Sequence, residues 1–488
     1  MLFNSYEFIF LFLPITLLVY LALSKGNLLL TAKVFLVTAS LFFYAWWNPI
    51  YLPLILCSII FNYLIGTLLA RKREKFSHSN RKIVFAAGIF GNLALLGYYK
   101  YADFFIANVN YISGFNISPR HIILPLAISF FTFQQIAYLF DTYRGECKEY
   151  SLLNYTLFVS FFPQLIAGPI VHHKEVIPQF EDSKNRLINF ENLSAGVFLF
   201  FIGLFKKVVL ADTFSILANN GFDKMSVLTF IEAWATSLSY TLQLYFDFSG
   251  YTDMALGAAL MFNIKLPTNF NSPYKSLNIQ DFWRRWHITL NRFMSNYVYI
   301  PMGGNRISLP RTLLNLMVTF LIGGLWHGAG WTFVFWGFLH GIAIAIHRIW
   351  RRFNINMPKF LAWFLTFNFV NIAWVFFRSR NFNDAFKVLK GMLGMSGVIL
   401  PGMLASKLAF LRQYGIDFRG LWMMNMANGE RLTIITFAFL LIVLLFKNSN
   451  QMIDSLKPTW KNFAFIMAIA IVSIFSMGRI QEFIYFNF

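Results

Sequence analysis

The chain has 488 residues, of which 57% are hydrophobic and only 13% are charged, and 60 of them are Phe. This composition excludes an ordinary water-soluble protein, because several apolar runs are each long enough to cross a bilayer core of roughly 30 Å. The net charge of +20 comes from Lys and Arg in short connections between those runs. That distribution is typical of the positive-inside bias of membrane proteins and argues against a nucleic-acid surface.

Three spans are predicted first, at Tyr6 to Leu23, Leu28 to Trp47 and Ile50 to Ala70. The first run lacks the basic start and small-residue cleavage site of a signal peptide, so we expect it to be retained. The densest basic block, Arg71 to Lys82, follows the third run and indicates a cytoplasmic loop. Three spans before a cytoplasmic loop place the N-terminus outside.

Ile83 to Tyr99 and His121 to Phe140 are the next predicted spans. The second contains Gln134 and Gln135, whose amides need partners inside the protein because lipid offers none. Hydrogen bonds between helices are the expected role of both side chains.

Broken backbone is predicted at Phe161 to Phe180, where Pro163, Gly168 and Pro169 interrupt an apolar run. Such breaks at membrane depth are tolerated where they are buried in protein or line a cavity, so we expect a re-entrant element. His172 and His173 lie within it, and an interfacial position without further function is an equal alternative for both.

Two further spans are predicted at Asn192 to Ala211 and Leu228 to Phe248. Polar residues follow at the end of the second, in YFDFSGYTDMALG, where Asp247, Ser249 and Asp253 are candidate substrate contacts. Carboxylates beside an apolar helix must be paired or hydrated. We therefore favour a structural ion pair over proton transfer, with the two arginines of the next segment as expected partners.

The stretch from Asp281 to Trp331 is the expected reaction centre. It contains DFWRRWH, PMGGNR and GGLWHGAGW, and it places His287 and His327, each beside a Trp, in an otherwise apolar chain. An imidazole titrates near neutral pH, and ionisable residues at membrane depth usually mark function. Residues 281–300 are expected to form an amphipathic interfacial helix. The candidate substrate contacts in this stretch are Trp283, Arg284, Arg285, Asn291 and Trp326.

The remaining spans are predicted at residues 311–325, 330–349, 360–377, 432–446 and 463–477, around a weakly apolar region at 378–431. We find no internal repeat, so residues 1–488 are expected to form a single all-α membrane domain of about 11 to 13 transmembrane helices, with re-entrant and interfacial helices. Cys57 and Cys147 have no spacing typical of a disulfide framework or a metal site and are expected to be free thiols.

Acyl transfer is the chemistry that best suits the two histidines. A neutral imidazole can take the proton from an acceptor hydroxyl as it attacks a thioester carbonyl, and a second polar group can stabilise the oxyanion. A zinc site would need a third ligand such as His340 or Asp281, and no H-E-x-x-H spacing exists, so no metal is expected. No serine-elbow, Walker A or dinucleotide-binding motif occurs.

The chain resembles the membrane-bound O-acyltransferase family over its whole length. The resemblance is carried by DFWRRWH, by GGLWHGA forty positions later, by YFDFSGYTDMA before them and by the terminal FIYFNF (Phe483 to Phe488). The resemblance is to its bacterial branch, which contains alginate- and peptidoglycan-acetylating proteins and the D-alanyl teichoic acid transfer protein. The PMGGNR turn and the length favour the acetylating side. One departure is FNF at the end, where relatives tend to have FQF.

This resemblance implies a ring of tilted helices around a central tunnel in the bacterial inner membrane. It places the essential histidine at His327 and the second catalytic position at His287. The implied donor is acetyl-CoA, and no tightly bound cofactor is implied. The implied partners are an extracytoplasmic SGNH-type protein, a polysaccharide acceptor such as alginate or peptidoglycan, and membrane lipid. D-alanyl transfer, and a transporter or channel with proton-relaying histidines, are the alternatives.

Overall fold

The protein is described by a computed structural model covering residues 1–488 except 72–76, 148–149, 167, 424–425, 427 and 479–488. Residues 72–76 of the basic block and the terminal FIYFNF motif lie outside the described residues. Seven described helical segments are long and apolar enough to cross a membrane, so the chain is a multi-pass membrane protein. These segments are Phe8–Lys25, Pro49–Ala70, Ser79–Ser113, Phe190–Lys224, Leu309–His327, Trp331–Phe353 and Lys359–Arg378.

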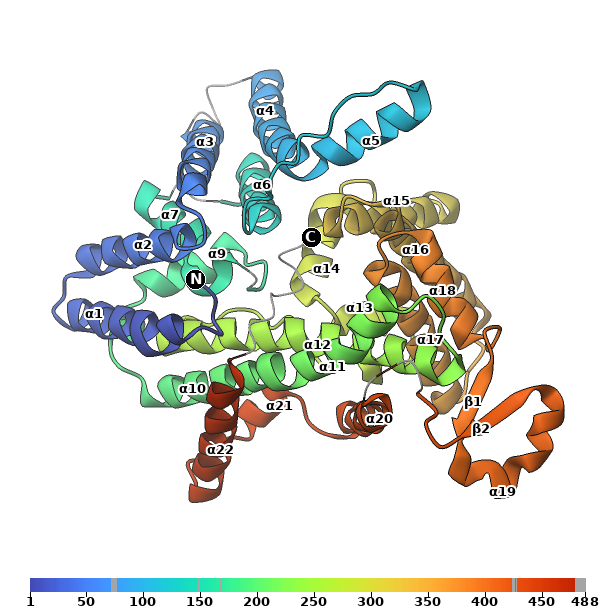
Figure 1. Cartoon of the computed structure of the whole chain (residues 1–488). Helices are drawn as coiled ribbons and strands as arrows, with labels where there is room; N and C mark the ends of the chain where they lie inside the picture. Colours follow the sequence, from blue (N-terminus) through green and yellow to red (C-terminus); the bar gives the residue numbers. More distant parts are fainter. Residues whose placement is uncertain (72–76, 148–149, 167, 424–425, 427, 479–488) are drawn as a thin grey trace.

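The first third of the chain is helical, and Figure 1 shows its helices on one side of the molecule. Residues 114–127 are not helical, so the span expected from His121 begins only at Ile128. The helices are α1 (Leu13–Lys25), α2 (Leu29–Ala45), α3 (Leu52–Arg71), α4 (His78–Leu96), α5 (Ala102–Ser113), α6 (Ile128–Arg144), α7 (Leu152–Ser160), α8 (Phe162–Leu165) and α9 (His173–Glu181).

The middle third contains α10 (Phe190–Phe205), α11 (Asp212–Asn219), α12 (Phe230–Met261), α13 (Ile279–Arg285) and α14 (Ile288–Met294). The long α12 packs against α10 through Gly203 and Gly250, where a Cβ on Gly203 would lie 2.5 Å from the Gly250 carbonyl oxygen. Only glycine permits this approach of the two backbones. The expected single helix over 281–300 is wrong, because the chain breaks between α13 and α14 at Trp286 and His287.

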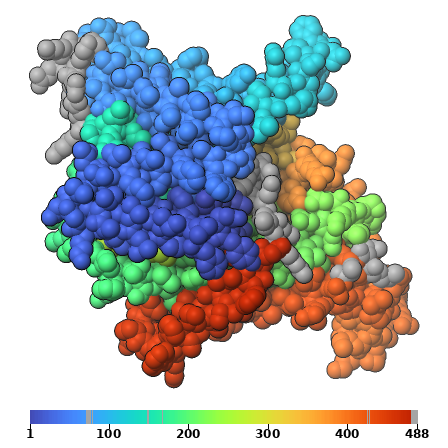
Figure 2. Space-filling view, turned by 60° about the vertical axis from the view of Figure 1, so that its left-hand side comes forward, coloured from blue at the N-terminus to red at the C-terminus, as the bar shows by residue number. Residues whose placement is uncertain are grey.

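The last third contains α15 (Leu309–His327), α16 (Trp331–Trp350), α17 (Lys359–Arg378), α18 (Phe382–Met392), α19 (Ala405–Leu408), α20 (Gly429–Leu445), α21 (Ser449–Asp454) and α22 (Trp460–Ser476). Strands β1 (Val398–Pro401) and β2 (Ile416–Arg419) pair in parallel, with Val398 opposite Ile416. The last helix returns to the first part of the chain, since Tyr6 Oη donates to the Ile474 carbonyl oxygen at 3.1 Å. Figure 2 shows red α22 beneath the dark blue N-terminal helices.

The distribution of polarity is that of a protein surrounded by lipid. Large apolar side chains face outward, for example Leu18, Phe90 and Phe475, whereas amides are buried. Gln135 donates to Ser58 Oγ at 2.8 Å across two helices, which confirms the role expected for it. The broken segment around α8 is also enclosed, because the described residues between Phe161 and Val171 are all buried.

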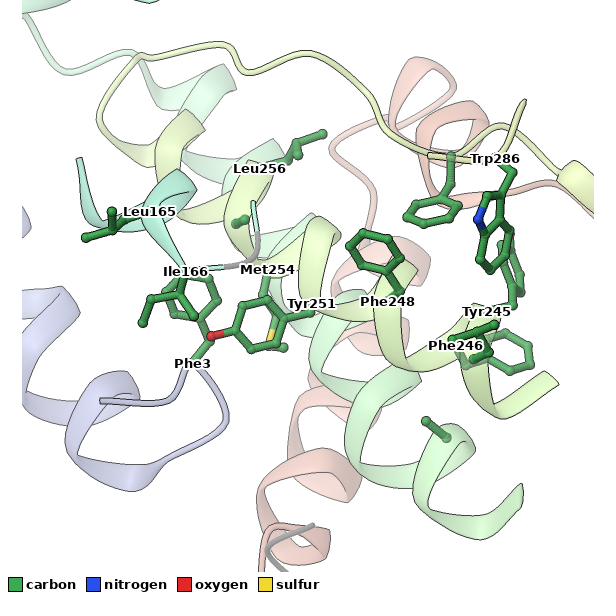
Figure 3. Close-up of a cluster of buried hydrophobic side chains, with 14 of the residues drawn as sticks. Phe3, Leu165, Ile166, Tyr245, Phe246, Phe248, Tyr251, Met254, Leu256 and Trp286 are labelled. Carbon is green, nitrogen blue, oxygen red and sulfur yellow. The ribbon is translucent and has the colours of Figure 1, made fainter. Parts of the chain in front are cut away.

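An aromatic row on α12 supports the break between α13 and α14. Phe248 packs edge-on against the His287 ring at 4.8 Å, and Tyr251 stacks on Phe3 at 4.8 Å. Figure 3 shows Phe248 and Tyr245 on the side of α12 toward Trp286, with Tyr251 toward Phe3 and Ile166. Figure 1 shows α13 and α14 in the middle of the molecule, and stacking of Phe133 on Phe293 joins α14 to α6.

Candidate active site

His287 and His327 lie together in the centre of the protein. The centroids of the two rings are 6.4 Å apart, although His287 lies in the break before α14 and His327 is the last residue of α15. His287 is 0% exposed and His327 is 3% exposed. A neutral imidazole can accept the proton of a hydroxyl group that comes within hydrogen-bond reach of a ring nitrogen.

The backbone and side chain of His287 are both held in an unusual state. Its φ of 44° and ψ of 53° are left-handed, a conformation that costs a non-glycine residue about 1–2 kcal/mol. Its Nδ1 lies 3.1 Å from Asn269 Oδ1, which can only accept, so Nδ1 carries the hydrogen and Nε2 carries the lone pair. Within the described part of the chain Nε2 is buried without a hydrogen-bond partner. Strain of this kind is concentrated at functional sites.

Asn269 is a site residue that the sequence did not reveal. Its Oδ1 accepts from Thr289 N at 3.2 Å and Thr289 Oγ1 at 3.0 Å as well as from His287, and these donors identify the atom as oxygen. Its carbonyl oxygen accepts from Ile288 N at 3.0 Å. The surrounding sequence, TNFNSPYKS, reads as a polar turn, and no spacing in it points to His287.

The His327 ring is fixed by aromatic side chains. Trp336 and Phe377 meet it edge-on at 5.1 Å each, and Trp326 does so at 5.0 Å. Helices α15 and α16 pack closely beside it, because a Cβ on Gly337 would lie 2.3 Å from the Phe320 carbonyl oxygen. Gly324, in the glycine-rich sequence before His327, takes part in this contact, because a Cβ there would lie 2.4 Å from the Phe333 carbonyl oxygen.

A cavity of about 210 Å³ reaches His327. Three predicted substrate contacts, Trp283, Arg284 and Asn291, line it, whereas His287 is not among its lining residues. Gly323 also lines it, with nothing within 4 Å of an added Cβ. The other lining residues are Gln280, Leu290, Met294, Ser295, Tyr299, Leu316, Thr319, Phe320, Trp336 and Ile344.

The mouth of this cavity is basic. An adjacent cavity of about 440 Å³ shares Gln280, Leu316 and Ile344 with the inner one. It is also lined by His347, Arg348, Arg351, Arg352 and Asn305. The HRIWRRF block, expected to be an interfacial cationic patch, thus supplies cations to the entrance of the cavity that contains His327. Guanidinium groups in such a place suit phosphate or carboxylate groups of a ligand.

Two other predicted contacts have structural partners. Arg285 Nε pairs with Asp281 Oδ1 at 2.9 Å, so neither group is directed at the histidines. Trp326 stacks on Phe133 at 5.2 Å and forms a wall beside His287 at 6.0 Å. The two extra ligands considered for zinc are also engaged elsewhere, since Trp283 Nε1 donates to His340 Nδ1 at 3.2 Å.

The carboxylates of α12 are paired with lysines, and the expected arginine partners are wrong. Lys207 Nζ lies 2.7 Å from Asp247 Oδ1, and Lys206 Nζ lies 2.6 Å from Asp253 Oδ2. Ser249, between them, is buried. The π-helical segment Lys206–Ala211 continues α10 and packs against α12, so its two lysines lie beside these carboxylates. The structural ion pairs favoured from sequence are confirmed, and Asp247, Ser249 and Asp253 are not among the residues lining the His327 cavity.

Asp141, His172 and His173 form a second cluster with metal-ligating side chains. Asp141 Oδ2 lies 2.6 Å from His172 Nε2 and 2.9 Å from His173 Nε2. Ligand atoms around a tetrahedral zinc ion would lie about 3.3 Å apart, given bonds of 2.0–2.1 Å. The observed distances are those of hydrogen bonds. Tyr297 Oη adds a further hydrogen bond, which it donates to Asp141 Oδ1 at 3.1 Å. His173 is therefore a buried network residue rather than an interfacial one.

Comparison with known proteins gives one consistent result. The model of the membrane-bound O-acyltransferase family (MBOAT) matches residues 15–383. The chain is 48% identical over 521 residues to a peptidoglycan O-acetyltransferase of Helicobacter pylori, covering 100% of this chain and 98% of that protein. It is 41% identical over 402 residues to a probable alginate O-acetylase of Pseudomonas aeruginosa, covering 80% and 75%. A teichoic acid D-alanyltransferase of Bacillus subtilis is 27% identical over 289 residues, covering 54% and 71%.

Proposed function

Because the chain belongs to the membrane-bound O-acyltransferase family, we propose that it moves an acetyl group from a cytoplasmic thioester to a hydroxyl of an extracytoplasmic polysaccharide. The observation that carries this proposal is the position of His327 at the inner end of a cavity whose mouth is lined by arginines. The chain is an O-acyltransferase, so the alternative hypothesis of a transporter or channel is not supported.

In the proposed reaction His327 acts as general base. It takes the proton of the acceptor hydroxyl as that oxygen attacks the acetyl carbonyl carbon, and a C–O bond forms. The C–S bond then breaks, and the proton passes from His327 to the departing thiolate. His287, whose lone pair is on Nε2, orients the acceptor hydroxyl by accepting a hydrogen bond from it or from a water beside it.

We propose acetyl-CoA as the donor, with its phosphates held at the basic mouth. Arg348, Arg351 and Arg352 supply the cations, and Arg284 lies farther along the path to His327. Arg-rich segments after a span tend to face the cytoplasm under the positive-inside rule, which supports a position of this mouth on the side where acyl-CoA is made. The inner cavity, with a volume of about 210 Å³, suits a pantetheine arm carrying a short acyl group.

The acceptor is proposed to be peptidoglycan or a related cell-surface polysaccharide, since the full-length relative is named for that polymer. We further propose location in the bacterial inner membrane and delivery through an extracytoplasmic SGNH-type partner. D-alanyl transfer receives less support, because that relative matches about half of this chain at lower identity.

The test is replacement of His327 in the native host. We expect His327→Ala and the more conservative His327→Gln to lose polymer-linked acetyl, measured as acetate released by mild base, at unchanged abundance in the membrane. His121→Ala, at an exposed histidine outside the cavity, is the matched control and should keep normal acetylation. Full acetylation in both His327 variants would refute the assignment of the base.

A further inference from the structure

A lysine outside the predicted site touches the residue proposed as base. Lys100 belongs to a π-helical turn, Gly97–Tyr101, that joins α4 to α5. Single π-helical turns within helices often occur at functional sites. Its Nζ lies 2.5 Å from the Trp326 carbonyl oxygen, 3.4 Å from that of His327 and 3.2 Å from Ser129 Oγ. These three acceptors match the three protons of an ammonium group.

The neighbouring residue continues the same contact. Tyr101 Oη donates to the Leu325 carbonyl oxygen at 2.7 Å, and Gly328 N bonds to the Gly324 carbonyl oxygen at 3.4 Å. A helix ends with four carbonyl groups that lack helical partners. The last four of α15, from residues 324 to 327, are thus all satisfied, three of them by Lys100 and Tyr101.

We propose that Lys100 is a positioning residue for acyl transfer, which holds the last turn of α15 so that the His327 ring stays in the cavity. This inference rests on the proposed function of His327. A cation at the C-terminal end of a helix also interacts favourably with the helix dipole. Two of the three hydrogen-bond acceptors of Lys100 Nζ are carbonyl groups of α15, and the third is the Ser129 hydroxyl.

The position of His327 depends on this cap because the chain leaves the helix at once. Gly328 is extended, with φ −161°, and the α16 helix starts at Trp331. Without the ammonium group the last turn of α15 can fray, and the imidazole is on its final residue. Misplacement of a catalytic group by about 1 Å can lower turnover about 100-fold. Donor binding at the arginine mouth lies at the other end of the cavity and is expected to be unaffected.

The experiment compares Lys100→Met, Lys100→Arg and Tyr101→Phe in membranes supplied with radiolabelled acetyl-CoA. We expect Lys100→Met to lower kcat about 100-fold with KM for acetyl-CoA within about twofold of the wild type. Lys100→Arg, which keeps a cation for the carbonyls, should recover most of that loss. Tyr101→Phe, which removes one neutral hydrogen bond to the same turn, is the matched control and should lower kcat less than about fivefold.

The following results decide whether Lys100 has this role. Wild-type kcat in Lys100→Met, or equal losses in Lys100→Met and Lys100→Arg, would overturn the positioning role. If Lys100→Met is depleted from the membrane, Lys100→Gln, which keeps one donor group, is assayed instead and must show the same loss of kcat at unchanged KM. His327→Ala is measured in parallel: activity in that variant refutes the proposed base, whereas its inactivity beside an active Lys100→Met refutes this inference alone.

Discussion

Removal of the Asn269 side-chain oxygen, without a large change in side-chain volume, should lower the rate of acyl transfer. Asn269→Leu keeps a side chain of similar size but takes away the oxygen that accepts from His287 Nδ1 and from both donors of Thr289. The imidazole then has no partner that fixes its tautomer, and the left-handed backbone of His287 has lost part of its support.

The magnitude follows from the loss of one buried, orienting hydrogen bond. An unsatisfied buried donor costs about 1–3 kcal/mol. Since 1.36 kcal/mol corresponds to tenfold in rate, we expect kcat to fall about 5- to 150-fold if His287 must be reoriented in the transition state. Asn269→Asp keeps acceptor oxygens in place and loses only Nδ2, which has no hydrogen-bond partner within the described residues, so it should retain clearly more activity.

The assay is acetyl transfer from radiolabelled acetyl-CoA in membranes, with enzyme abundance measured by immunoblot. Thr289→Val is the control, because it removes the hydroxyl bond to Asn269 and the bond that Thr289 Oγ1 accepts from Ile170 N, but leaves His287 its partner. Wild-type kcat in Asn269→Leu at normal abundance would show that the orientation of His287 does not matter.

Three further predictions concern the cavity, its mouth and the second histidine cluster. Gly323→Leu should fill the cavity and abolish acetylation, while Gly323→Ala, which fits the open space, should stay near wild type; equal activity of the two in an acetate-release assay would contradict the cavity path. Replacing Arg351 and Arg352 together by Gln should raise KM for acetyl-CoA at least about tenfold with kcat nearly unchanged, and steady-state kinetics would show otherwise if the donor enters elsewhere. Burial lowers the pKa of His173, although its hydrogen bond to Asp141 opposes this. A depressed pKa gives stability that is present above the ordinary histidine value of about 6.5 and is lost as the pH falls below it, so thermal unfolding in detergent should occur at lower temperature below about pH 6.5, and less steeply in His173→Gln.

Asp141, in the same cluster as His173, is expected to change the stability of the fold with pH in the same direction. Burial raises the pKa of the Asp141 carboxyl, but hydrogen bonds from His172 and His173 outweigh burial and hold that pKa below its usual range. The carboxylate therefore also favours the folded state above the ordinary aspartate pKa of about 4 and less so below it. Both groups destabilise the fold on acidification, although in different pH ranges.

Several properties of this protein could be predicted from the order of residues alone. The apolar runs predicted the membrane class and the positions of helices such as α15 and α16, because helix length and lipid exposure are local requirements. The pair His287 and His327 could be selected as well, since ionisable residues are rare in apolar sequence and these two occur beside Trp and Gly. Their separation in space, 6.4 Å between rings, agrees with that choice.

The partners of those residues were decided only by tertiary structure. Asn269 and Lys100 are separated from their histidines by 18 and 227 positions, as their hydrogen bonds show, and neither belongs to a recognisable motif. A cation at the end of an apolar run, at Lys100, was the one local signal available. The lysine partners of Asp247 and Asp253 were likewise set by the packing of α10 along α12.

Sequence thus determined which segments enter the membrane and which side chains are chemically unusual there, because both depend on the free energy of transfer of each segment by itself. Tertiary structure decided the tautomer of His287, the cap on α15 and the arginine-lined mouth of the cavity. Each of these depends on hydrogen bonds or cavity-lining side chains from a segment distant in the sequence, and no local pattern specifies which segment will supply them.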